Sequence, residues 1–174
     1  MKSLGYVYRG KKISVKVEEC MMPSGARTVN EIVEHIGSVA VLPLLDKETI
    51  VLLRQYRPIA GDWIYEIPAG TLEPGENPYE CARRELEEET GYKPGKLTKL
   101  FEMYLAPGYS TENLHSFVAT DLRLGMFNPS ESEEIEVVRK PLYEAIKMIK
   151  TNNIRDAKTI ATFLYYLRFG TVKE

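Results

Sequence analysis

The sequence predicts an α/β (α+β) domain in which α-helices cover a β-sheet, with a separate antiparallel β-sheet at the N-terminus. Several short runs alternate apolar and polar residues with the period of two that is typical of strands. Between residues 77 and 91, and twice near the C-terminus, apolar residues recur instead at helical spacing. A chain of 174 residues with 44% apolar and 28% charged residues is large enough for one such domain with a real core.

The first 37 residues are expected to form a β-sheet arm. Strands are predicted at residues 6–9, 13–20 and 27–35, with a glycine in each intervening turn. The arm holds too few large apolar residues for a core of its own. We therefore divide the chain into the arm, residues 1–37, and a main domain, residues 38–174.

The main domain begins with two dense apolar runs, residues 38–45 and 49–55. A short turn, Asp46-Lys47-Glu48, joins them, so they are predicted to be paired strands of the central sheet. Further strands are predicted at residues 96–105 and 114–121. The polar loop between these two, residues 106–112, is a candidate for contacting a ligand.

The second apolar run ends in a basic pair. Arg54 and Arg57 flank Tyr56, at a place where two guanidinium groups could bind a diphosphate. Two solvent-facing arginines are the alternative, and the sequence leaves both interpretations open. Trp63 follows shortly and could stack on a base, although a single tryptophan near a strand is more often part of the core.

Residues 77–91 carry signals for both ends of a helix. Asn77 is the predicted N-cap, Pro78 suits the first helical position, and Gly91 supplies the stop. An apolar stripe is expected to pack this helix on the sheet, formed by Tyr79, Ala82 and Leu86.

Glu85, Glu88 and Glu89 share another face of this helix, because residues three and four apart are neighbours. A solvated acidic face is the ordinary interpretation of such a run. Here the glutamates lie in the last turns, where the helix dipole disfavours negative charge, and neighbouring carboxylates repel by up to ~4 kcal/mol at an effective dielectric of ~20. Arg83 and Arg84 offset only part of this cost. The cluster therefore indicates a hard divalent cation, Mg²⁺ or Mn²⁺ rather than Zn²⁺.

These residues resemble the Nudix box, G-x5-E-x7-R-E-U-x-E-E-x-G-U, in which U is a bulky apolar residue. The matching positions are Gly70, Glu76, Arg84, Glu85, Leu86, Glu88, Glu89, Gly91 and Tyr92. Only Tyr92 differs from the usual motif, because it is an aromatic residue at a packing position where an aliphatic residue is usual. Nine specified positions at fixed spacing make a specific signal. The resemblance implies the Nudix fold, a mixed β-sheet sandwiched between α-helices, and hydrolysis of a nucleoside diphosphate linked to another moiety.

The segments around the box are similar to the ADP-ribose pyrophosphatase subfamily. In that subfamily the second arginine of the QYR element, here Arg57, meets substrate phosphate. The E-x-P-A-G element before the box places the carbonyl of Ala69 toward a cation. Pro107 stands sixteen positions after Gly91 (107 minus 91), and the loop APGYSTE, which includes Glu112, also looks like the subfamily.

The resemblance also implies roles on the helix. Glu85 and Glu89 are the main metal ligands, and Glu88 assists them. Arg84 is expected to orient the glutamates, and Glu76 to support the geometry of the loop and helix.

A second acidic stretch, residues 128–134, resembles the loop that closes over the site in bacterial ADP-ribose pyrophosphatases. Glu131 matches the general base, and Glu133 matches a further metal contact. Because register in a glutamate-rich loop slips easily, Glu112, Glu133 and Glu134 remain alternatives for the base.

Two amphipathic helices are predicted at residues 141–150 and 156–169, as structural cover for the sheet. Their inward residues are expected to be Leu142, Ala145, Ile146, Ile149, Ile160, Phe163, Leu164 and Leu167. We assign these helices no chemistry.

The net charge of −2 gives no basic footprint for nucleic acid or an anionic membrane. The N-terminus lacks the apolar core of a signal peptide, and no run approaches ~18 apolar residues, so the cytoplasm is the expected location. Cys20 and Cys81 are expected to be reduced structural thiols.

The implied reaction is metal-dependent hydrolysis of ADP-ribose to AMP and ribose 5-phosphate. The alternatives are a Nudix pyrophosphatase acting on other nucleotide sugars or dinucleotides, and a Nudix ligand sensor without catalysis. The arm resembles the one that ADP-ribose pyrophosphatases exchange or pack across a dimer, which implies a homodimer.

Overall fold

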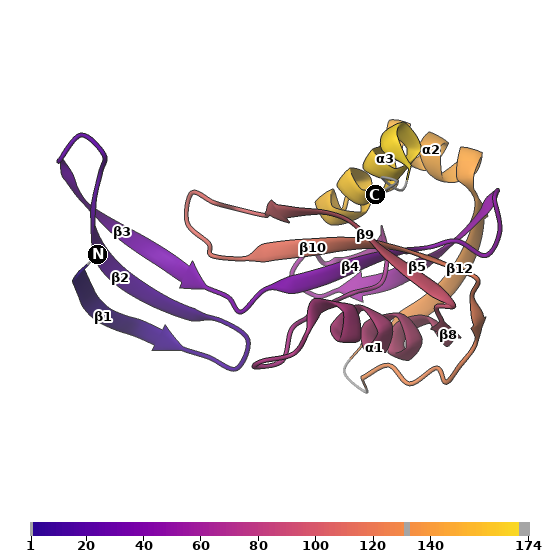
Figure 1. Ribbon diagram of the computed structural model, residues 1–174, viewed down its shortest axis with the longest axis horizontal. Coiled ribbons are helices and arrows are strands. Elements are labelled where there is room, and N and C mark those ends of the chain that lie inside the picture. Colours follow the sequence, from indigo (N-terminus) through magenta and orange to yellow (C-terminus); the bar gives the residue numbers. More distant parts are fainter. Residues whose placement is uncertain (1, 131–132, 171–174) are drawn as a thin grey trace.

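The computed structural model describes residues 2–130 and 133–170, with the backbone alone for residues 2 and 3. Figure 1 shows a three-stranded sheet that projects from a larger body of strands and helices. The projecting sheet is the arm, an antiparallel meander of β1 (Lys2–Arg9), β2 (Ser14–Met21) and β3 (Arg27–Glu34).

The arm depends on the main body for its placement. Its apolar side chains remain largely exposed, among them Val7 and Val29, so it has no core of its own. The end of β3 is instead bonded to the loop 106–112. The amide of Val33 donates to the carbonyl of Tyr109 at 2.7 Å, and the amide of Thr111 donates to the carbonyl of Val33 at 3.0 Å.

The central sheet of the body is mixed and four-stranded, in the order β7-β4-β10-β9. Strand β4 is parallel to β10, whereas β7 and β9 are antiparallel to their neighbours. The strands are β4 (Ser38–Pro43), β7 (Ala69–Thr71), β9 (Lys96–Tyr104) and β10 (Asn113–Thr120).

A second, antiparallel sheet has the order β12-β5-β6. It consists of β5 (Thr49–Arg57), β6 (Asp62–Glu66) and β12 (Ile135–Pro141). The predicted pairing of β4 with β5 is therefore wrong, apart from one bridge between Leu44 and Ile50. Both edges of β4 are already bonded, to β7 and β10, so β5 pairs elsewhere. The short strands β8 (Tyr92–Lys93) and β11 (Arg123–Leu124) pair separately.

Helices cover both faces of the mixed sheet, which confirms the predicted fold class (Figure 1). On one face, α1 (Pro78–Thr90) packs Leu86 among residues that include Val41 and Phe117. On the other face, α3 (Ala157–Phe169) packs Phe163 into a cluster with Leu42, next to α2 (Leu142–Lys150). Alternate residues of each strand thus supply the two sides of the core.

The predicted caps of α1 are confirmed. The side chain of Asn77 accepts a hydrogen bond from the amide of Tyr79, and Pro78 is the first helical residue. Gly91 has φ of 72°, the left-handed conformation that a glycine adopts without strain, and its amide donates to the carbonyl of Glu87.

Among the residues described, no helix combines the length and apolar character that crossing a bilayer requires.

Candidate active site

A pocket of about 530 Å³ opens beside the central sheet, a size typical of sites for small ligands. The second half of α1, the strands β4 and β7, the first turn of α3 and the tip of the arm all contribute to its wall. Its lining residues are Lys12, Ser38, Val39, Arg57, Ala69, Gly70, Thr71, Glu73, Arg84, Glu85, Glu89, Leu105, Glu112, Leu114, Glu133, Asp156, Ala157 and Lys158.

Arg84 holds three carboxylates in place, those of Glu76, Glu85 and Glu88. Its guanidinium donates twice to Glu76, at 3.0 and 3.1 Å, and through Nη1 to Glu85 at 2.7 Å and Glu88 at 3.2 Å. The bonds from Arg84 lower the pKa of Glu76 to about 2. These are the contacts that an orienting role requires, and the same arginine offsets part of the repulsion among the glutamates.

Glu85 lies directly on the backbone of Gly70. A Cβ atom at position 70 would stand 2.0 Å from the carboxyl carbon of Glu85, so only glycine leaves room for that carboxylate. Burial raises the pKa of Glu85, with Glu88 and Glu133 adding to the rise, while Arg84 opposes it. The site thus concentrates negative charge where solvent stabilises it poorly.

Glu89 is the most buried acid of the cluster, with 5% of its surface exposed. Its carboxylate accepts a hydrogen bond of 3.0 Å from the amide of Ala69. Burial raises its pKa to about 8, and the charges of Glu85 and Glu133 add to the effect. A buried carboxylate with such a pKa would gain strongly from a nearby cation.

The donor set fits a hard divalent cation. The carboxylates of Glu85, Glu88, Glu89 and Glu133 and the carbonyl of Ala69 offer oxygen atoms alone, the ligands that Mg²⁺ and Mn²⁺ prefer. Within residues 2–130 and 133–170, no three acidic, histidine or cysteine side chains already converge as a metal site. Arg84 bonds one oxygen of Glu85 and one oxygen of Glu88, so the second oxygen of each carboxylate is left for a cation.

The pocket brings together most of the residues that the sequence nominated, since Arg57, Ala69, Arg84, Glu85, Glu89, Glu112 and Glu133 line it. Glu88 adjoins the lining through Arg84. Pro107 lies outside the lining, in the loop that carries Glu112. Glu131 falls outside the described residues, so its assignment as the base stays a prediction.

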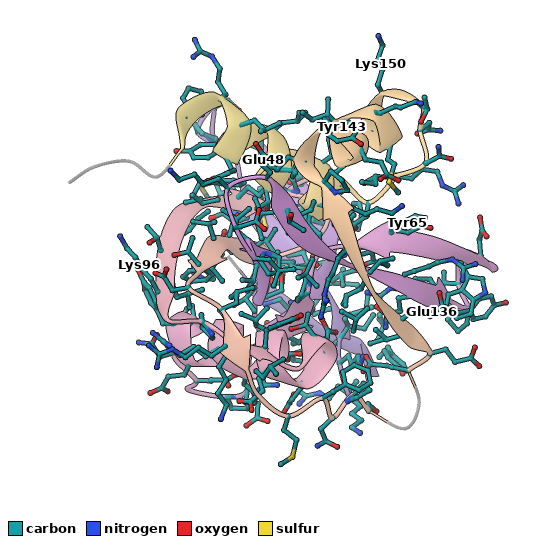
Figure 2. All side chains as sticks on the ribbon, turned by 90° about the vertical axis from the view of Figure 1, so that its right-hand side faces the viewer. Glu48, Tyr65, Lys96, Glu136, Tyr143 and Lys150 are labelled. Atoms are coloured by element: carbon teal, nitrogen blue, oxygen red, sulfur yellow. The ribbon has the colours of Figure 1, made fainter. Side chains whose placement is uncertain are left out.

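Arg54 and Trp63 lie on the opposite face of the second sheet from Arg57. Side chains alternate along a strand, so residues 54 and 57 project to different sides of β5. The guanidinium of Arg54 stacks on Trp63 at 4.4 Å and donates to Glu136 at 2.9 Å. Figure 2 shows Glu136 and Tyr65 on the strands β12 and β6 that flank β5. Within this chain, neither Arg54 nor Trp63 lines the pocket.

The structure adds residues that the sequence did not single out. Glu66 is buried behind Arg57, and Lys158 and Asp156 come from the start of α3. Two features of the sequence could have indicated them. One is a glutamate at the end of an apolar strand, and the other is a lysine in the first turn of a helix, where the helix dipole disfavours a positive charge. Lys12 enters from the turn between β1 and β2, which no local pattern indicates.

Gly70→Ala tests the contact with Glu85. The added methyl group meets only the end of a side chain, so the fold should persist while Glu85 is displaced. We expect kcat to fall roughly 100-fold, the cost of misplacing a reacting group by about 1 Å. Steady-state kinetics and thermal unfolding measure the two effects.

Gly125→Ala is the matched control, because its methyl group would displace the side chains of Glu87 and Lys93, both outside the pocket lining. Equal losses of activity in the two variants would show that the close contact at Gly70 has no special part in the site.

Buried carboxylates beside cationic side chains, in a pocket of this size on a mixed sheet between helices, suit the binding of a diphosphate together with a cation. The NUDIX domain model matches residues 34–163, and the chain belongs to the NUDIX family of hydrolases. Hydrolases of this family use a divalent cation.

Individual relatives cover most of the chain. The ADP-ribose pyrophosphatase of Bacillus subtilis is 40% identical over 170 residues, 97% of this chain and 90% of that protein. The methanol dehydrogenase activator of Bacillus methanolicus is 36% identical over 161 residues, 91% and 87% of the two chains. The GDP-mannose pyrophosphatase of Citrobacter koseri is 40% identical over 140 residues, 74% and 72% of the two. A solved structure described as an ADP compounds hydrolase superposes with a TM-score of 0.81 at 26% identity, covering 97% of this chain and 94% of the other.

Proposed function

We propose that this protein hydrolyses the diphosphate bond of ADP-ribose, giving AMP and ribose 5-phosphate, with Mg²⁺ as its cation and Mn²⁺ as a substitute. The main support for the proposal is that the buried acids of α1 and Arg57 line the same pocket. The charge of Arg57 is near enough to lower the pKa of Glu89. ADP-ribose is favoured as the substrate by the similarity to the Bacillus subtilis enzyme, which extends over 97% of the chain.

The residues divide the work of the reaction. Glu85, Glu89 and the carbonyl of Ala69, with Glu88 and Glu133, would hold the cation, which neutralises the diphosphate and acidifies the attacking water when bound. Arg57 binds a diphosphate oxygen, and Arg84 keeps the glutamates oriented. A loop glutamate accepts the proton of the water as its oxygen bonds to phosphorus, and the bond from phosphorus to the bridging oxygen breaks.

The test is release of AMP from ADP-ribose by purified protein with Mg²⁺, beside GDP-mannose, a dinucleotide and a nucleoside triphosphate. We expect ADP-ribose to have the highest kcat/KM. A preference for GDP-mannose, the substrate in the name of the Citrobacter koseri relative, would replace the substrate and keep the chemistry. Ligand binding without turnover at any divalent cation would favour a sensor.

Four glutamates compete for the role of base, Glu112, Glu131, Glu133 and Glu134, and separate glutamine variants distinguish them. We expect Glu131→Gln to lower kcat about 100-fold with metal affinity nearly unchanged, since a general base contributes at least that factor. Glu133→Gln should weaken metal binding instead. The hydroxyl of Ser38 donates to Glu112 at 2.7 Å within the pocket, which makes Glu112 the strongest rival. A larger fall in kcat for Glu112→Gln than for Glu131→Gln would transfer the role.

We also propose a homodimer in which the partner covers the arm, while nucleic acid and membrane are not partners and the cytoplasm is the location. The exposed apolar residues of the arm, such as Val7 and Val29, support the dimer. Val29→Glu should convert the dimer to a monomer in sedimentation velocity. A wild-type protein that sediments as a monomer would refute the arrangement.

A further inference from the structure

The loop 106–112, which carries Glu112, is bonded to the end of the arm. Figure 1 shows this loop, between β9 and β10, reaching from the central sheet toward the arm. The hydroxyl of Thr111 accepts a hydrogen bond from the amide of His35 at 2.9 Å and donates to the carbonyl of the same residue at 3.1 Å. His35 directly follows β3. One hydroxyl therefore joins the loop to the residue just after the last strand of the arm.

The residue after Thr111 is a pocket residue that is bonded to the same stretch of chain. Glu112 lines the pocket, and its carboxylate accepts a hydrogen bond of 2.7 Å from the hydroxyl of Ser38, the first residue of β4. Ser38 is three positions after His35. Thr111 and Glu112 on one side, and residues 35–38 on the other, thus form a short ring that hydrogen bonds close at both ends. Releasing one end of the ring frees the backbone next to Glu112.

The turn of the loop forms without the hydroxyl of Thr111. The amides of Tyr109 and Ser110 both donate to the carbonyl of Ala106, at 3.1 and 2.8 Å. The hydroxyl of Ser110 accepts from the amide of Glu112 at 3.2 Å. Both bonds of the Thr111 hydroxyl go instead to a residue 76 positions away in sequence. The contribution of this hydroxyl is therefore to orient the loop relative to the arm.

The opposite side of the ring is held by contacts of its own. Gly37 has φ of 116°, a conformation that favours glycine, and a Cβ atom there would stand 3.0 Å from the side chain of Leu72. The carbonyl of Gly37 accepts from the amide of Leu72 at 3.1 Å, and its amide donates to Nδ1 of His35 at 3.0 Å. Residues 35–38 thus give Thr111 a fixed support.

We infer that Thr111 is a positioning residue that holds Glu112 in the pocket by bonding the end of the arm. The position of Glu112 then depends on the position of the arm. This inference rests on the proposed function, because it gives Glu112 a part in the reaction that the pocket carries out.

The first experiment removes the hydroxyl with Thr111→Val and restores it with Thr111→Ser. In Thr111→Val the amide hydrogen of His35 loses its acceptor, so it should exchange with deuterium about 3- to 10-fold faster, the range for one neutral hydrogen bond. We expect kcat/KM for ADP-ribose to fall by a similar factor, and Thr111→Ser to match the wild type. Unchanged exchange and unchanged kcat/KM in Thr111→Val would overturn the inference.

A double-mutant cycle with Glu112→Gln separates the positioning of Glu112 from a general effect on the loop. If Thr111 acts through Glu112, both single variants should change the same kinetic parameter, kcat or KM. Thr111→Val should then have no further effect once Glu112 is replaced. Effects that multiply in the double variant, or an unchanged kcat/KM in Glu112→Gln, would refute the role and leave Thr111 a structural residue.

Thr151→Val is the matched control. Thr151 is also exposed, and its hydroxyl donates to the carbonyl of Lys147 at 2.9 Å, at the end of α2 and outside the pocket lining. This variant should keep the kcat/KM of the wild type. A fall equal to that of Thr111→Val would show that the loss is not specific to the loop, and would overturn the inference.

The inference and the proposed function fail in different ways. If the protein hydrolyses GDP-mannose in place of ADP-ribose, the substrate is wrong and the same cycle on GDP-mannose tests Thr111. If ADP-ribose is bound without turnover, the cycle is measured by calorimetry as affinity for ADP-ribose. If ADP-ribose is hydrolysed and Thr111→Val matches the wild type, the reaction stands and the positioning role is wrong.

Discussion

Replacing Glu89 with glutamine is expected to lower kcat for ADP-ribose roughly 1,000-fold, while the fold survives. Glu89 is a buried acid of the proposed cation site, and glutamine keeps its shape and its acceptor for the amide of Ala69 but loses the charge. A cation contributes several kcal/mol to the transition state, and about 1.4 kcal/mol corresponds to a tenfold change in rate. Kinetics at saturating Mg²⁺, with circular dichroism for the fold, measure the result.

The same substitution should stabilise the metal-free protein at high pH. Burial raises the pKa of Glu89 to about 8 in the native state, above the value of an unfolded glutamate, about 4.3. Between these values the native protein retains a proton that the unfolded chain has lost, so the free energy of unfolding falls as pH rises. Above pH 8 Glu89 is ionised in both states, and the full destabilisation from its buried charge is present. In EDTA, the melting temperature of Glu89→Gln relative to wild type should therefore increase from pH 5 to pH 8.5, by about 2–4 °C for each kcal/mol.

Glu80→Gln provides the control, because Glu80 is an exposed acid in the first turn of the same helix and outside the pocket lining. It should change neither kcat nor the pH dependence appreciably. Near-normal activity of Glu89→Gln would mean that the cation site lies elsewhere in the pocket.

The parts of the site that the sequence could predict are those fixed by local geometry. The caps Asn77 and Gly91 determine where α1 begins and ends, and helical spacing then places Glu85 and Glu89 one turn apart. Whether Arg54 or Arg57 faces the pocket is a different kind of question. Alternation along β5 separates the two arginines, but which face is inward depends on the two strands that pair with β5. One of them, β12, is distant in sequence, and no local pattern predicts the other, β6.

The buried face of α3 shows why tertiary contacts escaped prediction. Leu164 and Leu167 were expected inside but are exposed, and so is Ile146 of α2. Thr159 and Thr162 are buried in their place. The hydroxyl of Thr162 pairs with that of Ser116 at 2.9 Å, and Thr159 accepts from the amide of Ile67. These polar side chains are tolerated inside because each meets a hydrogen-bonding partner far along the chain.

Lys158 escaped prediction for the same reason. It meets Glu66 across 92 residues of sequence, a contact that exists only once α3 has packed beside the end of β6. A lysine in a first helical turn is unusual, but the sequence does not show which residues it will contact. The fold determines this, because it places the lysine next to Arg57 in one pocket.

Glu66→Gln should cause the largest loss of stability, because it leaves Arg57 and Lys158 side by side without the carboxylate that both bind. Removing one partner of a buried ion pair costs ~3–5 kcal/mol, and the 39% exposure of the Arg57 side chain reduces this to about 2–3 kcal/mol. We expect the melting temperature at pH 7 to fall by about 5–10 °C. Thermal and urea unfolding measure the change, and the KM for ADP-ribose should rise as Arg57 loses its position.

The pH dependence of this loss identifies its cause. Burial alone would raise the pKa of Glu66, but the hydrogen bonds from Arg57 and Lys158 outweigh it and hold the pKa below its usual value. The stabilisation is therefore present above the pKa of an unfolded glutamate, about 4.3, and is lost as pH falls below it. The difference in melting temperature between wild type and Glu66→Gln should shrink as the pH falls from 7 to 3.5.

Glu136→Gln is the control, because it breaks a similar bond to Arg54 on the opposite face of the sheet from Arg57. Glu136 is 55% exposed there, so the substitution should cost at most about 1 kcal/mol. If both variants lose the same small amount, the buried carboxylate contributes no more than a surface ion pair, and the paired cations are held by the rest of the pocket.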